Sequence, residues 1–155
     1  MEDQPKPPNE VNEPALKYGD DTVQQGYAPL SGASILAMAN QAKVGVSMAK
    51  VQEIADGFAF TLEQMAQLLH VSLRTLQRRD PADAMSVPIS ERILQLQELH
   101  AQGLSVFGEA ETFQAWLQEP IMALGGSTPL HMLDTTFGVQ LVSQALGRLA
   151  YGVFS

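Results

Sequence analysis

Apolar residues recur every three or four positions along most of the chain beyond Ser31, which is the spacing of a helix with one buried face. This pattern predicts a short first helix around Ile35 and Met38 and a second helix that ends near Gly57. No segment alternates apolar and polar residues as a strand does, and the chain has no internal repeat and no sustained heptad. The fold class expected from this pattern is therefore all-α.

Two short helices with clear start signals come next. Thr61 and Gln64 have the spacing of a capping box, in which each side chain satisfies the other residue's free amide, and their helix should run to Leu69. Ser72 is a second favourable N-cap, and its helix should continue through Arg79. The aspartate–proline pair that follows should end it, because the residue before a proline disfavours helical geometry.

The second half of the chain has a longer helical pattern, interrupted at glycine and proline. The helices expected here are a long amphipathic helix from Pro88 to Gly108, a short helix around Trp116 closed by Pro120, a short helix that begins at Thr128 and Pro129, and a last helix capped by Thr135 or Thr136 that ends near Gly152. The buried side of the last helix is expected to carry Phe137, Leu141, Val142, Ala145, Leu146, Leu149 and Ala150.

Composition separates the N-terminal segment from the rest of the chain. Residues 1–30 hold five of the nine prolines, among acids and amides, and have no apolar face. Such a segment cannot offset the ordering entropy of a packed core, so a disordered tail that is dispensable for folding is expected. The alternative is an acidic segment that folds on a partner.

Composition also excludes several classes of protein. The chain has 155 residues and no cysteine, so disulfides, zinc fingers, iron–sulfur clusters and cysteine nucleophiles are excluded. It has no apolar run of the roughly 20 residues that span a bilayer, and its first residues have neither a basic region nor a hydrophobic stretch. A cytoplasmic protein without a membrane anchor is therefore expected.

Charge is distributed unevenly along the chain. The net charge is −8, with −4 in residues 1–22 and −4 in residues 86–155, whereas residues 61–85 carry three acids and three arginines. All three of these arginines fall between Arg74 and Arg79. An acidic chain usually disfavours nucleic acid, but this local basic site keeps nucleic-acid binding open.

Residues 61–79 have the spacing of a helix-turn-helix. Ala66 is small enough to let the second helix cross closely, and Val71 and Leu76 supply the apolar contacts of the crossing. His70 takes the turn position where glycine is commoner, and histidine tolerates positive φ better than most residues. The DNA-binding residues expected on the outer side are Ser72, Arg74, Thr75, Arg78 and Arg79. The alternative is that these arginines only complement the dipole of the helix C-terminus.

Three spaced blocks in the second half carry a family resemblance. The blocks are Trp116-Leu117 before a proline, then Leu124-Gly125-Gly126-x-Thr128-Pro129-Leu130 with Leu133-Asp134-Thr135, then Leu146-Gly147-Arg148 followed by Tyr151-Gly152-Val153. In this order they resemble the C-terminal toxin-binding domain of the Xre/MbcA/ParS family of antitoxins. With the helix-turn-helix upstream, the resemblance covers roughly residues 34–155. The tail predicted from composition, residues 1–30, lies outside it, and the resemblance implies an Xre-like helix-turn-helix domain at 31–85 and a toxin-binding domain at 86–155.

The resemblance also implies a function and its partners. Members of this family are antitoxins encoded beside a RES-domain toxin that consumes NAD, and they typically repress their own operon. The expected partners are this toxin, operator DNA and a second copy of the chain in a homodimer, with no cofactor, metal or membrane. The residues expected to bind the toxin are Arg148, Tyr151, Gly152, Val153, Phe154 and Ser155, because the end of the chain can enter a cleft. Arg148 alternatively complements the helix C-terminus.

The other residues of the three blocks have structural explanations. Trp116 is expected in the core, Gly125 and Gly126 in a tight turn, and Thr128 and Pro129 at a helix start. The remaining structural positions are Asp134, expected as a cap or turn residue, and Gly147, where another helix or chain can approach closely.

An enzyme is the least favoured class. His70, His100 and His131 are scattered over different elements, and only His131 and Asp134 have helix-neighbour spacing. No nucleophile or third ligand accompanies them, so no catalytic residue is assigned. The three hypotheses are an antitoxin, a stand-alone helix-turn-helix repressor without a toxin partner, and a small hydrolase.

Overall fold

The structure, a computed structural model, describes residues 30–152. The helices follow in the order α1 (Gly32–Val44), α2 (Met48–Phe58), α3 (Leu62–Leu68), α4 (Leu73–Gln77), α5 (Val87–Phe107), α6 (Ala110–Leu117), the 3₁₀ helix η1 (Met122–Leu124), α7 (Pro129–Met132) and α8 (Thr136–Ala150). The described part of the chain contains no strand, and one isolated antiparallel bridge joins Ser47 to Ala84. The all-α class predicted from the apolar spacing is confirmed.

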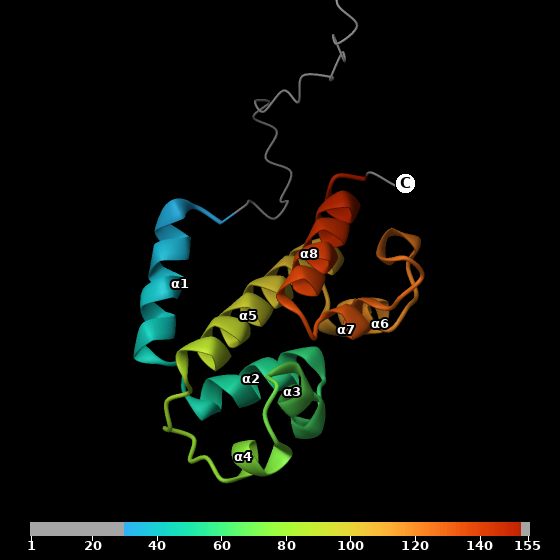
Figure 1. The fold of residues 1–155 in the computed structure, drawn as a ribbon. Helices are drawn as coiled ribbons and strands as arrows, with labels where there is room; N and C mark the ends of the chain where they lie inside the picture. The colour runs from blue at the N-terminus through green and yellow to red at the C-terminus, as the bar shows by residue number, and fades with distance from the viewer. Residues whose placement is uncertain (1–29, 153–155) are drawn as a thin grey trace, which may run out of the picture.

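The long helix α5 is the centre of the fold. Its 21 residues make it about 30 Å long, and α1, α2, α6 and α8 all pack against it. Figure 1 shows α5 between α1 and α8, with α4 at one end of the molecule and the last turn of α8 at the other. None of the described helices is long and apolar enough to cross a membrane.

The predicted start signals of the short helices are confirmed. Thr61 Oγ1 accepts a hydrogen bond from the amide of Gln64 at 3.1 Å, and Gln64 Oε1 accepts one from the amide of Thr61 at 2.9 Å. Ser72 Oγ accepts from the amide of Thr75 at 3.1 Å, and Thr128 caps α7 in the same way. These local bonds fix where each helix begins, because they satisfy amides that lack an intrahelical partner.

The end of α4 differs from the prediction. The helix ends at Gln77 and does not continue through Arg79. The amide of Arg79 donates to the carbonyl of Leu76 at 3.1 Å, which tightens the last turn, and the amide of Asp80 donates to Asp83 Oδ2 at 2.9 Å. The chain therefore enters a turn held by an aspartate side chain before it reaches the proline.

The aromatic part of the core lies between α2, α5 and α6. Phe113 is fully buried, and its ring lies near those of Phe58, Phe107 and Trp116. Gly103 on α5 faces this ring so closely that a Cβ atom there would lie 2.4 Å from it. The half-buried Trp116 stacks on the outer side of the cluster.

The first helix is less covered than the others. Only Ala42 of α1 is buried, and Leu36 is 63% exposed. Several apolar residues of α1 therefore lie on a side of the helix that no other part of the described chain covers. The predicted tail lies outside the described residues except for Leu30, as do Val153, Phe154 and Ser155.

Candidate functional sites

The helix-turn-helix predicted from spacing is formed by α3, the turn at His70 and α4. Ala66 and Leu76 are buried where the two helices cross, and Val71 is half-buried beside them. His70 has a φ of 57°, so it takes the left-handed geometry that the turn requires. The amide of Val71 donates to the carbonyl of Ala66 at 3.0 Å and closes the turn.

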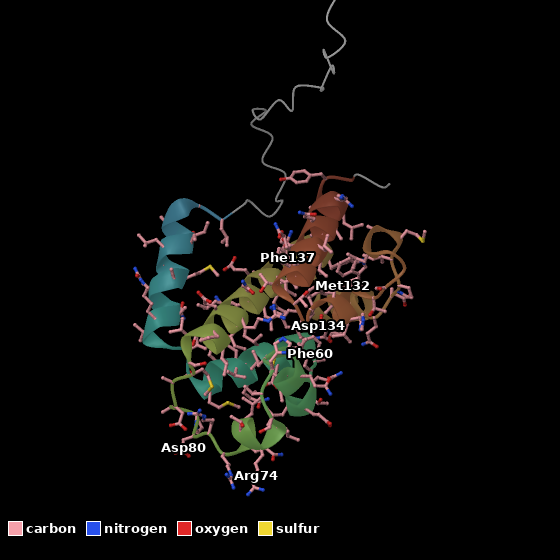
Figure 2. All side chains as sticks on the ribbon, in the orientation of Figure 1. Phe60, Arg74, Asp80, Met132, Asp134 and Phe137 are labelled. Carbon is pink, nitrogen blue, oxygen red and sulfur yellow. The ribbon has the colours of Figure 1, made fainter. Side chains whose placement is uncertain are left out.

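The residues predicted to bind DNA lie on the exposed side of this unit. The exposed positions are Ser72, Arg74, Thr75, Arg78 and Arg79. Arg74 and Arg78 are four positions apart, and the amide of Arg78 donates to the carbonyl of Arg74 at 3.2 Å, so the two side chains leave the same side. Figure 2 shows Arg74 at the end of the molecule, pointing away from its body. This surface has the donors that phosphate oxygens and guanine edges accept.

A buried arginine that sequence reasoning missed connects the turn to the second half. Arg92 on α5 is 8% exposed, and its Nε donates to the carbonyl of Leu68 at 3.4 Å. Its Nη2 donates to the carbonyl of Leu133. These carbonyls lie at the C-terminal ends of α3 and α7, where a cation is favourable. Burial lowers the pKa of the Arg92 guanidinium, and the nearby Asp134 carboxylate opposes that shift.

The turn residue itself makes a second connection. His70 Nε2 donates to the carbonyl of Asp134 at 2.8 Å. Asp134 lies in the turn between α7 and α8, and the cap of α8 is Thr135, whose Oγ1 accepts from the amide of Gly138 at 2.9 Å. The sequence predicted His70 only as a turn residue. Its bond to Asp134 joins residues 64 positions apart, and no local sequence pattern predicts such a contact.

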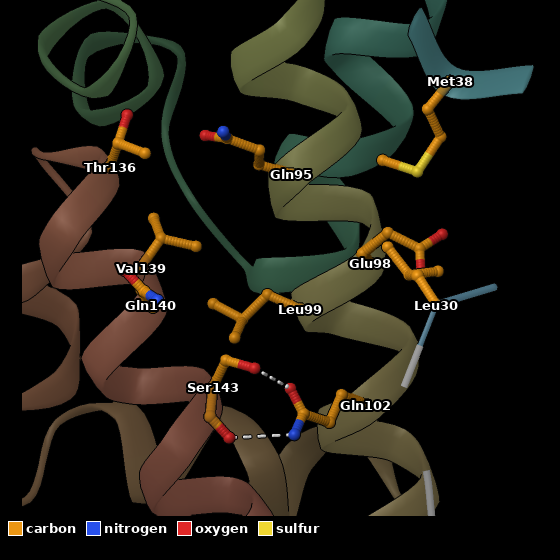
Figure 3. A pocket seen from close by; sticks show the side chains of 10 residues that line it. All are labelled: Leu30, Met38, Gln95, Glu98, Leu99, Gln102, Thr136, Val139, Gln140 and Ser143. Atoms are coloured by element: carbon orange, nitrogen blue, oxygen red, sulfur yellow. Dashed lines mark hydrogen bonds between the residues drawn. The ribbon is translucent and has the colours of Figure 1, made fainter. Parts of the chain in front are cut away.

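Helix α8 is fixed to the rest of the fold by two close contacts. A Cβ atom on Gly138 would lie 1.7 Å from the carbonyl oxygen of Met132, so α7 and α8 meet at a distance that only glycine allows. On α5, Gln102 Nε2 donates to the carbonyl of Ser143 at 2.9 Å, and Ser143 Oγ donates to Gln102 Oε1 at 2.8 Å. Figure 3 shows this pair of bonds at one end of a groove of about 250 Å³ between α1, α5 and α8.

The prediction of which residues of α8 are buried was partly wrong. Phe137 and Leu141 were expected on the buried side, but Phe137 is 79% exposed and Leu141 is 43% exposed. Val142, Ala145 and Leu146 are buried as expected, and Val139, which was not expected there, is buried with them. The helix has two apolar stripes, and the contact between Gly138 and Met132 decides which of them faces the core.

The predicted toxin contacts lie at the end of the same helix. Arg148 is exposed on the last turn, and Tyr151, which follows the helix, is 69% exposed. Gly152 has a φ of 67°, in the left-handed region. A Cβ atom on Gly147 would meet nothing within 4 Å, so this surface is open.

The remaining motif residues shape the segment between α6 and α8. Gly125 and Gly126 have φ values of 67° and 81°, which form the tight turn after η1. Thr128 Oγ1 accepts from the amide of His131 at 3.2 Å, and Pro129 occupies the first position of α7. This segment carries the chain back to the contact between α7 and α8.

Comparison with known proteins identifies both halves of the chain. Residues 37–98 match the antitoxin Xre-like helix-turn-helix domain, and residues 102–152 match the antitoxin Xre/MbcA/ParS C-terminal toxin-binding domain. "Antitoxin Xre" of Pseudomonas putida is 34% identical over 110 residues, which cover 64% of this chain and 69% of the relative. The chain belongs to this family of Xre antitoxins.

Two other relatives extend the similarity of this Xre antitoxin over most of its length. A protein named "Prs ADP-ribosylating antitoxin", from Sphingobium sp. (strain YBL2), is 29% identical over 147 residues, with 88% of this chain and 92% of the relative covered. "Antitoxin Xre" of Photorhabdus laumondii subsp. laumondii is 26% identical over 132 residues, which cover 84% of this chain and 87% of the relative. The two matched domains meet within α5, which therefore belongs to both halves.

This chain belongs to a family whose members are described as antitoxins. Its histidines have separate structural contacts: His70 bonds to Asp134, and His100 Nε2 donates to the carbonyl of Gly57 at 3.0 Å. His131 lies exposed on α7. Within residues 30–152, no group of three or more histidines and acids is arranged to hold a metal ion.

Proposed function

We propose that this antitoxin neutralises a RES-domain toxin that consumes NAD by covering the toxin's active site, and that it represses its own operon through α4. The observation that carries the proposal is that α4, with exposed arginines on and just after it, and the end of α8 lie at opposite ends of the molecule (Figure 1). Because these surfaces lie apart, one chain can contact DNA and toxin together. Both roles belong to the cytoplasm, where the operon and the toxin are found.

The DNA-binding role rests on α4 and the residues around it. Ser72 and Thr75 carry hydroxyl groups 2.7 Å apart, and Arg74 and Arg78 extend from the same side of the helix. We assign Arg74 to base edges because residues at the start of a recognition helix face the groove, and Arg78 as well because it lies one turn further on the same side. We assign Arg79 to phosphate. A homodimer would present two such helices to a symmetric operator with half-sites about one helical turn apart.

The toxin-blocking role rests on the end of α8 and the residues after it. A pocket that accepts the phosphates of NAD is electropositive, and residues 86–155 carry a net charge of −4, which would steer this domain toward it. Arg148 would pair with a carboxylate or carbonyl of the toxin, and Tyr151 would supply rigid apolar area with one polar tip. Gly152, Val153, Phe154 and Ser155 would occupy the path of NAD, which requires no chemistry from the antitoxin.

The test is deletion of residues 148–155, with Arg74→Ala as the matched control. Each variant is co-expressed with the toxin encoded beside the antitoxin gene, and growth, cellular NAD and operator binding are measured. We expect the deletion to bind the operator but fail to preserve NAD, and Arg74→Ala to preserve NAD but bind the operator weakly. Full rescue by the deletion at matched expression would place inhibition elsewhere on the domain.

A further inference from the structure

The outer side of α8 carries a row of exposed side chains that begins in the first turn of the helix, far from the residues at its end that were assigned to toxin contact. Phe137, Leu141, Gln144, Arg148 and Tyr151 follow one another at intervals of three or four positions, so they lie along one side of the helix. We call these five residues the α8 stripe. It opposes the buried stripe of Val139, Val142 and Leu146.

The chemistry of the α8 stripe is that of a protein-binding surface. A single exposed apolar side chain is ordinary, but this stripe combines two aromatic residues, a leucine and an arginine. Aromatic residues and arginine are the types that dominate the binding energy of protein interfaces. Helix α8 contains no acid, and its single charge is Arg148, although the half of the chain that contains it is acidic.

The α8 stripe is also held in a fixed position. The close approach of Gly138 to Met132 fixes one end of the helix, and the two hydrogen bonds between Gln102 and Ser143 fix its middle. A rigid surface loses little conformational entropy when a partner binds. From Phe137 to Arg148 the stripe is about 16 Å long, which suits a groove that receives one side of a helix.

We infer that the toxin occupies the α8 stripe, with Phe137 and Leu141 as the apolar anchors that set affinity. This inference rests on the proposed function. Two observations favour the toxin over a second copy of the chain. The stripe lies within residues 102–152, the domain described as toxin-binding, and it leads directly into the residues assigned to occlusion.

The experiment compares three forms of the full chain against the purified toxin encoded beside the antitoxin gene. The first is the double variant Phe137→Ala with Leu141→Ala, which changes exposed side chains and leaves the buried stripe intact. The second is Leu36→Ala, a matched control that removes an exposed leucine from α1, outside the toxin-binding domain. The third is the deletion of residues 148–155. Circular dichroism confirms folding, and calorimetry and NAD hydrolysis give binding and inhibition.

We expect the double variant to bind the toxin at least about tenfold more weakly than the unaltered chain. At saturating concentration it should still inhibit NAD hydrolysis, because residues 148–155 are intact. The deletion should show the reverse, with measurable binding and no inhibition. Leu36→Ala should match the unaltered chain in both measurements.

The outcomes separate the inference from the proposed function. If the double variant binds the toxin as tightly as the unaltered chain, the α8 stripe is not the contact, and the deletion then decides the proposed function alone. If the double variant binds normally but loses self-association in sedimentation, a second copy occupies the stripe and the inference is wrong. An equal loss of toxin affinity with Leu36→Ala would also contradict the inference, because the effect would not be specific to α8.

Discussion

The exposed sides of α4 and α8 differ in how they can recognise a partner. The α4 side presents Arg74 and Arg78 with hydroxyl groups beside them and no aromatic residue. The α8 stripe presents Phe137, Leu141 and Tyr151 and a single charge. Binding to the first surface would act through charge and be weakened by salt, whereas binding to the second would act through desolvation and contact. One small chain thus carries two surfaces that respond to different conditions.

The two helices also differ in what fixes them. A serine cap and the capping box beside it define α3 and α4 within residues 61–79. In contrast, α8 depends on contacts with residues distant in sequence, such as the bonds between Gln102 and Ser143. The helix-turn-helix unit of α3 and α4 is therefore specified locally, whereas the position of α8 is specified by tertiary packing.

The largest effect should come from Gly138→Ala, which tests the packing of α8. The new Cβ atom would lie 1.7 Å from the carbonyl oxygen of Met132, so α7 and α8 must separate. We expect a loss of about 3 kcal/mol in the free energy of unfolding, measured by urea denaturation. Toxin affinity should fall with it, because the α8 stripe loses its support.

Gly147→Ala is the matched control on the same helix. A Cβ atom there meets nothing within 4 Å, and alanine favours a helix interior, so stability should be unchanged or higher by up to about 1 kcal/mol. Equal stability of the two variants would contradict the close approach of α7 and α8.

These contacts show which parts of the molecule the sequence could predict. The capping box at Thr61, the cap at Ser72 and the positive φ of His70 were predictable because each depends on a few neighbouring residues. The exposed position of Phe137 was not, because α8 has two apolar stripes and periodicity alone does not select one. The choice is made by Gly138 against α7, which is a tertiary contact.

The candidate site residues also differ in whether neighbouring residues or tertiary contacts determine them. Basic residues after a capped turn predict a DNA-binding surface from the sequence alone, and the structure shows that these residues are exposed. Arg92 was missed because a lone arginine within an amphipathic helix is usually solvated, and only the fold brings the carbonyls of Leu68 and Leu133 to it.

The next effect in size concerns the charged surface of α4. Arg74→Ala should weaken operator binding by roughly 1–3 kcal/mol if the side chain reads a guanine, and loss of a phosphate contact at Arg79 should lower the salt slope by about one. Fluorescence anisotropy at several salt concentrations measures both. Toxin affinity of the unaltered chain should change much less over the same salt range.

Arg148→Ala is the control for this prediction, since it removes an exposed arginine from α8 and leaves α4 intact. It should leave operator affinity unchanged and weaken toxin binding. A footprint that is unaltered by both Arg74→Ala and Arg78→Ala would mean that α4 does not contact the operator.

A smaller effect is expected at the connection between the two halves. Arg92→Met keeps much of the buried volume but removes the donors to the carbonyls of Leu68 and Leu133. The loss in unfolding free energy should be only about 1 to 2 kcal/mol, because Nη1 of Arg92 is buried without a hydrogen-bond partner among the described residues. Urea denaturation followed by circular dichroism measures the loss.

Trp116 fluorescence provides a second signal from the toxin-binding half. Arg92→Lys keeps the charge but lacks the planar fork of arginine, so it cannot donate to both carbonyls. Its free energy of unfolding should lie between that of Arg92→Met and that of the unaltered chain. A stability of Arg92→Met equal to that of the unaltered chain would show that the halves do not depend on this residue.

The smallest effects should come from Ala59 and His70, the two residues other than glycine that have a positive φ within residues 30–152. Both have a φ of 57°, which is unfavourable for a residue with a Cβ atom. Ala59 ends α2 and is exposed, so Ala59→Gly should raise the free energy of unfolding by about 0.5 to 1 kcal/mol.

His70→Gly relieves the same backbone strain but also removes the donor to the carbonyl of Asp134, which is worth about 1 kcal/mol. The gain and the loss should nearly cancel, so His70→Gly should have close to the stability of the unaltered chain. Urea denaturation of both variants side by side gives the difference between them, which measures the bond from the turn to the α7–α8 corner. If His70→Gly were stabilised as much as Ala59→Gly, the bond from His70 to the carbonyl of Asp134 would contribute nothing to the free energy of unfolding.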